Sequence, residues 1–284
     1  MCGVRMILRT IAVLIRRGVV VRPRCLETRW AFEHILTNRG RDFMQVSDRL
    51  GREMDVWVIP LDAPLPGAED ISRVLAPDEC ARAEHFLRPL DRQRWINGRL
   101  AVRRHLAAYL CCTPESIRLG TRGHGKPVIV DPGSPSLHFN VSHSQEVALL
   151  AVTAAGPVGV DVERIRPVAD LPRIVTRFFS PSEQSCILQA SAPELESRFF
   201  TCWTRKESVL KALGVGLSMA LDTFDVSVLP DEPARVLSWR DTPEEAARWR
   251  LQDLKVGEGY VACVAQGSAD LHVNLFTTED SPPE

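Results

Sequence analysis

The stretch VGVDVERIRP, residues 158–167, constrains the fold most because its side chains alternate in character. Valine occupies positions 158, 160 and 162, and the acids Asp161 and Glu163 stand between and after these valines. In a β-strand successive side chains point to opposite faces, so the valines share one face and the acids share the other. Neighbouring carboxylates repel each other. The stretch therefore predicts a strand with one core face and one acidic face that needs a positive partner.

The bulk properties favour a globular protein and exclude several classes. A chain of 284 residues suffices for one large domain or two small ones. Its net charge of −1 gives no basic surface of the kind that nucleic-acid binding needs. The eight cysteines form no C-x-x-C pair, which argues against a zinc site or a disulfide framework. We therefore predict reduced thiols and a cytoplasmic location.

The N-terminal segment looks unlike the rest of the chain. The run MILRTIAVLIRRGVVV is apolar, but three arginines interrupt it, and it is shorter than the roughly 20 apolar residues that span a bilayer. No small-residue cleavage site follows it, so a signal peptide is not indicated. Residues 1–53 show no clear period, whereas MDVWVIP, from Met54, is typical of a strand that opens a domain. We predict that residues 1–53 are a poorly ordered extension or result from an over-long start.

The remaining segments predict an α+β fold. Residues 76–112 have a helical pattern with an apolar stripe and a basic face, and residues 120–163 have the pattern of strands, with EVALLAVT and PVGVDVE forming a hairpin. Two helices follow: FFSPSEQSCILQA begins with a capping signature at Ser180, and residues 196–213 end at Gly214. Residues 248–266 predict another hairpin, and the last residues a disordered tail. The halves 54–157 and 158–284 have similar layouts, which indicates a pseudo-dimer of α+β units.

A second group of charged residues lies on the predicted helix WTRKESVLKALG. Glu207 and Lys211 are four residues apart and so share a helix face, with Lys206 at its edge. A simple salt bridge worth a few tenths of a kcal/mol would also explain this pair. Lysine is rare here: only four of the 35 basic residues are lysines, and Lys126, Lys206 and Lys211 all fall in the segments with possible functional residues.

The acids of the strand and the helix together indicate a cation site. Three carboxylates, Asp161, Glu163 and Glu207, can converge on one point only if a positive charge lies between them. Mg²⁺ is bound by carboxylate oxygens at roughly 2.1 Å and keeps positions for water and phosphate oxygens. Nearby cations, such as Lys126, His143 and Lys211, could hold further phosphate oxygens. The set predicts a site for a polyphosphate ester.

The order of five short motifs resembles a known family. GKP, FNVSHS, GVDVE, FFSPSE and WTRKESVLKALGVGL occur in the order and spacing of the 4′-phosphopantetheinyl transferase superfamily, and the resemblance covers about residues 54–265. The length resembles its larger monomeric class, the Sfp-type enzymes. The resemblance implies a pseudo-dimer with its active site between the halves. It also implies transfer of the phosphopantetheine arm of coenzyme A to a serine of an apo carrier protein or domain of a fatty-acid, polyketide or peptide synthetase.

The resemblance also implies roles for individual residues. Asp161, Glu163 and Glu207 would hold Mg²⁺, Glu163 directly or through water. Glu207 would also be the base for the carrier serine, and Lys211 would offset charge on the leaving phosphate. The predicted contacts to coenzyme A are Arg82, Lys126, Ser142, His143 and Lys206. Ser142 could instead complete a turn, and His143 could be a hydrogen-bonding surface residue.

Two other functions are compatible with parts of this pattern. A carrier-protein docking module could keep the fold without turnover, and an unrelated Mg-dependent nucleotide hydrolase could use the same acids. The predicted docking surface includes about residues 165–180, and acidic helices of a carrier protein could meet Arg164, Arg166, Arg173 and Arg177.

Overall fold

The computed structural model describes residues 48–123, 125–132, 137–267 and 272–277. The chain divides into two units, Met1–Arg41 and Asp42–Glu284, and every described residue belongs to the second unit. Most of the predicted N-terminal extension and the predicted C-terminal tail lie outside the described residues.

The second unit alternates helices and strands. Its helices are α4 (Ala68–Val74), α5 (Pro77–Glu84), α6 (Pro89–Tyr109), α7 (Leu171–Phe178), α8 (Pro181–Leu188), α9 (Ala192–Leu213) and α10 (Pro243–Arg248). Its strands are β1 (Glu53–Pro60), β2 (Arg118–Arg122), β3 (Lys126–Asp131), β4 (His138–Ser144), β5 (Val147–Thr153), β6 (Val158–Arg164), β7 (Phe224–Val226), β8 (Val236–Trp239), β9 (Trp249–Asp253), β10 (Tyr260–Gly267) and β11 (His272–Thr277). No described helix has the length and apolar character needed to cross a membrane.

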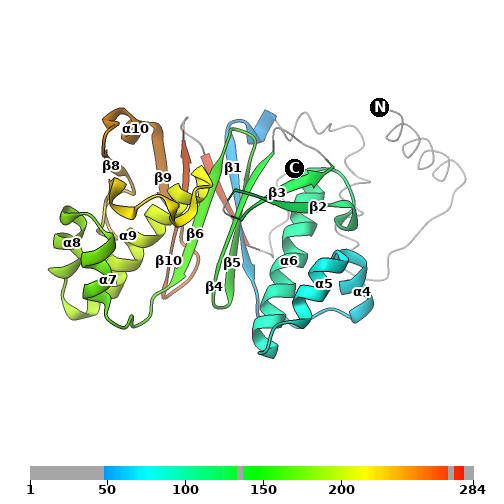
Figure 1. The fold of residues 1–284 in the computed structure, drawn as a ribbon. Coiled ribbons are helices and arrows are strands. Elements are labelled where there is room, and N and C mark those ends of the chain that lie inside the picture. Colours follow the sequence, from blue (N-terminus) through cyan, green and yellow to red (C-terminus); the bar gives the residue numbers. More distant parts are fainter. Residues whose placement is uncertain (1–47, 124, 133–136, 268–271, 278–284) are drawn as a thin grey trace, which may run out of the picture. The chain divides into compact units, whose positions relative to one another are not determined.

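Two sheets form the centre of this unit (Figure 1). One has four strands in the order β11-β1-β5-β4, and the other has three in the order β6-β10-β9. The apolar faces of the two sheets share a core that includes Val56 and Leu149 from the first sheet and Val160 and Val264 from the second. The predicted core face of residues 158–163 is therefore observed, because Val158, Val160 and Val162 all lie in this core.

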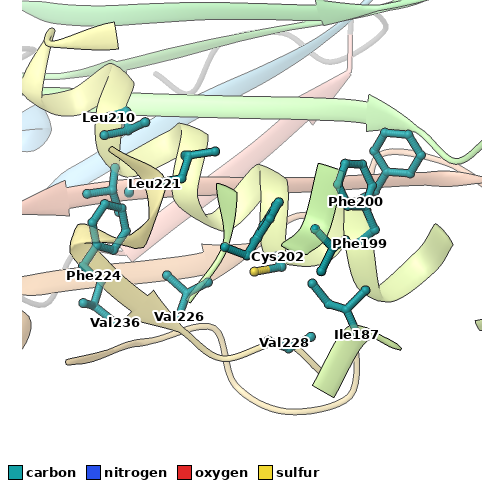
Figure 2. Close-up of a cluster of buried hydrophobic side chains, with 14 of the residues drawn as sticks. Ile187, Phe199, Phe200, Cys202, Leu210, Leu221, Phe224, Val226, Val228 and Val236 are labelled. Carbon is teal, nitrogen blue, oxygen red and sulfur yellow. The ribbon is translucent and has the colours of Figure 1, made fainter. Parts of the chain in front are cut away.

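A long helix covers the outer side of each sheet (Figure 1). Val102 and Leu106 of α6 pack with Trp57 and Leu150 of the first sheet. In the second half, α9 contributes Phe199, Phe200 and Leu210 to a separate core, in which Phe224 and Val226 of β7 also lie (Figure 2). The result is the predicted α+β fold with two halves, each a sheet covered by a helix.

The hairpin predicted between EVALLAVT and PVGVDVE is wrong. β5 already pairs with β1 on one edge and with β4 on the other, so it has no free edge for β6. β6 pairs instead with β10 in the second sheet. The chain therefore changes sheets at residues 154–157, and the observed hairpin of this region is β4–β5.

The predicted division into halves changes at both ends. β11 lies in the second predicted half but pairs in parallel with β1 of the first sheet. At the start, Leu50 is fully buried in the first half's core, and the Arg49 guanidinium bonds both oxygens of buried Asp55 at 2.9 and 2.6 Å. Residues 48–53 therefore belong to the folded unit and not to the predicted extension.

The helix boundaries follow local chemistry. The predicted helical region 76–112 is split because Arg88 precedes Pro89 and adopts an extended backbone, which proline favours in the residue before it. Ser180 caps α8 as predicted, since its hydroxyl accepts the Glu183 N–H while the Glu183 carboxylate accepts the Ser180 N–H. Gly214 ends α9 with a φ of 72°, a left-handed conformation that glycine adopts easily.

Candidate active site

Helix α9 lies unusually close to β6, and a glycine permits this approach. A Cβ atom on Gly159 would lie 1.9 Å from the Ser208 carbonyl oxygen and 2.4 Å from the Ala212 nitrogen, distances that no side chain can occupy. Asp161 and Glu163 follow at the next two positions on the same face of the strand. The close approach at Gly159 therefore brings these acids to the face of α9 that carries Glu207 and Lys211.

Asp161 and Lys211 form the centre of the site. The Lys211 Nζ donates to Asp161 Oδ1 at 2.6 Å and to the Ser142 hydroxyl at 2.8 Å. The Ser142 hydroxyl in turn donates to Asp161 Oδ1 at 2.8 Å. Three elements, β4, β6 and α9, thus meet at one carboxylate oxygen.

The other oxygen of Asp161 lacks a partner. Oδ2 is buried and accepts no hydrogen bond from the described residues. Burial raises the pKa of Asp161, although Lys211 and Ser142 act in the opposite direction and Glu163 adds repulsion. A buried, unpaired carboxylate oxygen is costly unless a ligand satisfies it.

Glu207 belongs to the same electrostatic cluster. Burial and repulsion from Asp161 and Glu163 raise its pKa to about 6, while Lys211 lowers it. These couplings show that the structure brings the three predicted acids into one region from two distant segments. One lysine ammonium compensates only part of their charge.

The donor set fits a hard divalent cation. Carboxylate oxygens are the ligands that Mg²⁺ prefers. An added positive charge would satisfy the unpaired Asp161 Oδ2 and would stabilise the ionised form of Glu207, which burial and the neighbouring acids disfavour. The described residues contain no group of three or more His, Cys, Asp or Glu side chains that already has the arrangement of a metal site. A cation here would therefore be shared with ligand oxygens or water.

Glu163 is held differently from the other two acids. Its Oε2 accepts a hydrogen bond from the Ser144 hydroxyl at 2.8 Å and from Arg166 at 3.1 Å. It lies nearer the surface than Asp161, with 22% of its side chain exposed against 6%.

Lys126 joins the first half to the second. Its Nζ donates to the Val158 carbonyl at 3.1 Å and to the Ala212 carbonyl near the end of α9 at 3.0 Å. Burial lowers the pKa of Lys126 to about 8. The Lys126 amine is thus close to the site, but its hydrogen bonds go to backbone carbonyl oxygens.

The other predicted coenzyme A contacts occupy varied positions. His143 is exposed on β4, between the two serines whose hydroxyls bond the acids. Arg82 is exposed on α5, where its guanidinium lies 5.7 Å from the centroid of the Trp95 ring. No described contact joins Arg82 to the acids.

The Ser142 hydroxyl has one donor and two acceptor sites, and Asp161, Lys211 and the Val162 N–H use all three. A contact from Ser142 to a ligand would have to replace one of these bonds.

The predicted role of Lys206 does not fit the structure. Its side chain is fully buried, and its Nζ lies 2.8 Å from Glu183 Oε1 and donates to the carbonyls of Leu221 and Phe224. Lys206 therefore holds α9 against α8 and β7, and its ammonium is buried among protein partners where a ligand would have to displace them. The sequence could not reveal this because the buried partner Glu183 lies on a different helix.

Sequence reasoning missed two contributors to the site, Gly159 and Ser144. Ser144 positions Glu163 as Ser142 positions Asp161, and the signal for both was the alternation N-x-S-x-S in FNVSHS. Alternate residues of a strand share a face, so Asn140, Ser142 and Ser144 were bound to point the same way.

Two family models match the chain. A model described as the 4′-phosphopantetheinyl transferase superfamily matches residues 157–265, and one described as the N-terminal part of a 4′-phosphopantetheinyl transferase matches residues 67–155. The boundary between these matches coincides with the change of sheets at residues 154–157. All acids of the site fall in the first match, and Lys126, Ser142 and Ser144 fall in the second.

Individual relatives extend over most of the chain. The 4′-phosphopantetheinyl transferase HetI of Nostoc sp. is 36% identical over 217 residues, which are 76% of this chain and 88% of that protein. The 4′-phosphopantetheinyl transferase Sfp of Bacillus subtilis is 29% identical over 76% of this chain and 94% of its own length. The human L-aminoadipate-semialdehyde dehydrogenase-phosphopantetheinyl transferase is 29% identical over 74% of each chain.

Proposed function

This chain belongs to the 4′-phosphopantetheinyl transferase superfamily and is a transferase of this type, and on that premise we propose the reaction that its site performs. The 4′-phosphopantetheine arm of coenzyme A is transferred to a serine hydroxyl of an apo carrier protein. The serine oxygen forms a bond to the phosphorus, the bond to the bridging oxygen of the diphosphate breaks, and adenosine 3′,5′-bisphosphate leaves.

One observation carries this proposal: a base and a cation on one helix lie against two acids on one strand. Glu207 and Lys211 are one turn apart on α9, and Lys211 bonds Asp161 of β6 at 2.6 Å. A diphosphate brings several negative charges, so it needs positive charge next to the base that activates the nucleophile. The arrangement offers a lysine and a set of oxygen donors suited to Mg²⁺.

Asp161, Glu207 and Glu163 are the residues that would hold Mg²⁺. When bound there, the ion would neutralise charge on the diphosphate and so stabilise the departing phosphate. The unpaired Oδ2 of Asp161 is the protein atom that supports this assignment most directly. Lys211 supplies the complementary positive charge from α9.

Glu207 is the proposed base for the carrier serine. A serine hydroxyl is a poor nucleophile at neutral pH and needs an adjacent base to take its proton. In the metal-free protein the pKa of Glu207 is raised to about 6, which leaves this carboxylate mostly ionised at pH 7 and so able to accept a proton. The proton passes from the serine oxygen to Glu207, directly or through a water molecule.

The nucleotide end of coenzyme A is proposed to lie along the first half. Lys126, His143 and Arg82 supply cations or donors there for its phosphates. With a pKa of about 8, Lys126 is mostly protonated at pH 7 and can attract phosphate while its hydrogen bonds keep β3 against α9. Ser142 contributes through Asp161 unless a ligand replaces one of its bonds.

The carrier protein is proposed to approach α7. Arg173 and Arg177 are exposed on this helix, and exposed Phe178 lies beneath the Arg177 guanidinium, 5.2 Å from the ring centroid. Arg166 continues the basic surface but is partly engaged with Glu163. An acidic carrier helix would complement these charges, and added salt should then raise the apparent KM for the carrier.

Incubation with coenzyme A, Mg²⁺ and an apo carrier protein tests the proposal. Mass spectrometry of the carrier should show the gain of one phosphopantetheine arm, with one adenosine 3′,5′-bisphosphate formed per arm. Breakdown of coenzyme A without carrier modification would indicate a Mg-dependent hydrolase instead. Carrier binding without either reaction would indicate a docking module.

Glu207→Gln tests the proposed base. The amide keeps the size of the side chain but cannot accept the serine proton. We expect this variant to bind coenzyme A nearly as well as the unmodified protein in calorimetry and to lose transfer. Unchanged turnover would refute the assignment of Glu207 as the base.

A further inference from the structure

The edges of the two sheets meet along β4 and β6, and side chains bridge them. The N–H groups of Val160, Val162 and Arg164 on β6 donate to Asn140 Oδ1, Ser142 Oγ and Ser144 Oγ on β4, at 2.9, 3.4 and 3.1 Å. Each β6 residue is 20 positions after the β4 residue that it bonds, and this constant offset shows that the two strands run parallel. We call these three pairs the seam ladder.

The seam ladder replaces an ordinary backbone ladder. β4 is the last strand of its sheet and β6 is the first strand of the other, so each has an unpaired edge. Edge N–H groups need an acceptor when they are buried. Side-chain oxygens reach across a wider gap than carbonyl oxygens, so they satisfy β6 while the two sheets remain separate.

Two members of the seam ladder also touch the acids. Ser142 accepts from residue 162 and donates to the carboxylate of Asp161, and Ser144 accepts from residue 164 and donates to the carboxylate of Glu163. The same spacing of 19 residues relates Asn140 to Gly159, which has no side chain that Asn140 could hold. Each serine hydroxyl therefore accepts a hydrogen bond from the β6 backbone and donates one to an acid. Through these two bonds, the register of β4 against β6 determines where the acid lies.

We propose that Ser144 is a positioning residue that orients Glu163 for ligand binding. The hydroxyl is buried, and it fixes Glu163 Oε2 from the side of β4 while Arg166 holds the same oxygen from the side of solvent. The two donors together fix the position of Glu163 Oε2. This inference rests on the proposed function, because it concerns the cation that the three acids would hold.

A merely structural role for Ser144 makes a different prediction. If the hydroxyl only completed the contact between the sheets, its loss would lower stability and leave the affinity of the folded protein for a cation unchanged. If it positions Glu163, its loss lowers that affinity in the folded protein. Partners that orient ligand side chains commonly affect metal binding by on the order of tenfold.

The experiment compares Ser144→Ala, Ser144→Thr and Ser238→Ala in the full chain. Threonine keeps the hydroxyl at position 144. Ser238→Ala is the matched control, because Ser238 donates to Asp225 at 2.9 Å between β7 and β8, away from the acids. Electron paramagnetic resonance measures the dissociation constant for Mn²⁺ without coenzyme A, and thermal unfolding confirms that each variant is folded. Amide hydrogen exchange by NMR measures protection of the Arg164 N–H.

We expect Ser144→Ala to bind Mn²⁺ about tenfold more weakly and to exchange the Arg164 amide faster. Ser144→Thr should recover most of the affinity, and Ser238→Ala should change neither quantity. Mn²⁺ affinity within twofold of the unmodified protein in a folded Ser144→Ala variant would overturn the proposal, and so would equal losses in the alanine and threonine variants.

The same data separate this inference from the proposed function. A protein that binds Mn²⁺ but does not modify a carrier contradicts the proposed function alone, and the comparison of Ser144 variants still decides the role of the hydroxyl. A protein that modifies a carrier but binds no Mn²⁺ in the absence of coenzyme A contradicts this inference alone.

Discussion

The Nζ atom of Lys211 lies 2.6 Å from Oδ1 of Asp161, and this ion pair joins α9 to β6. It explains how a strand with a core face can carry two neighbouring acids. Lysine from the helix compensates one acid, a serine and an arginine hold the other, and the remaining negative charge is concentrated near Glu207. That remaining charge is what the proposed cation would compensate.

Glu207→Gln should stabilise the protein at neutral pH in the absence of metal. Because the folded pKa is raised from 4.5 to about 6, the folded chain binds this proton more tightly than the unfolded chain, and ionisation costs stability. The cost is absent below pH 4.5 and complete above about pH 6. We expect Glu207→Gln to be more stable by about 1 kcal/mol at pH 7.5, after allowance for solvent screening, and equal to the unmodified protein at pH 4.5.

Urea unfolding with a chelator present measures this difference. Glu196→Gln, at a half-buried position of the same helix, is the matched control for removing a glutamate from α9. A gain for Glu207→Gln that does not change between pH 4.5 and 7.5 would contradict the raised pKa.

Gly159→Ala should disrupt the site by moving α9. The new Cβ atom would fall 1.9 Å from a backbone oxygen of the helix, and neither strand nor helix can yield without disturbing a core. We expect a loss of about 3 kcal/mol in unfolding free energy and loss of transfer activity. Gly67→Ala is the control, because nothing lies within 4 Å of its added Cβ. Wild-type activity in Gly159→Ala would show that the approach of α9 is not needed.

Arg49→Ala should destabilise the first half. It removes the guanidinium that pairs with Asp55, whose side chain is fully buried. Breaking a buried pair from one side costs about 3 kcal/mol, although Tyr109 and Asn274 still donate to Asp55. Arg73→Ala removes an exposed arginine from its pair with Asp70 and should change stability by less than about 0.5 kcal/mol. Equal effects in denaturant titrations would place residues 48–53 outside the folded unit.

Lys206→Met should lower stability without raising the KM for coenzyme A. The substitution leaves the Glu183 carboxylate buried without its cation, at a cost of about 3 kcal/mol or more. Adding Glu183→Gln should recover part of this loss, because the second change removes the uncompensated charge. A Lys206→Met variant with unchanged stability and a raised KM would instead restore the predicted contact with coenzyme A.

Local features of the fold could be read from the sequence, and pairings between distant strands could not. Alternation in residues 158–163 identifies a strand and its core face, and the capping residues at Ser180 and Gly214 fix helix ends, because each depends on neighbours in the chain. The partner of a strand depends on which edges are free. β6 pairs with β10 because β1 and β4 already occupy both edges of β5.

The same distinction between local features and distant contacts applies to the candidate site. The sequence places Lys126, Lys206 and Lys211 in the segments with possible functional residues, and each of the three makes defined contacts inside the fold. Their separate roles depend on burial, which the sequence does not show. Lys206 is one position from Glu207, yet a turn of about 100° per residue sends it into the core of the second half while Glu207 faces β6.

Crystals grown with coenzyme A and MnCl₂ test the central claim most directly, because anomalous scattering locates Mn²⁺ without reference to activity. The account predicts one Mn²⁺ peak bonded to carboxylate oxygens of Asp161 and Glu207 and to the diphosphate of coenzyme A. A well-ordered coenzyme A bound elsewhere, or a Mn²⁺ peak that contacts neither of these acids, would contradict it.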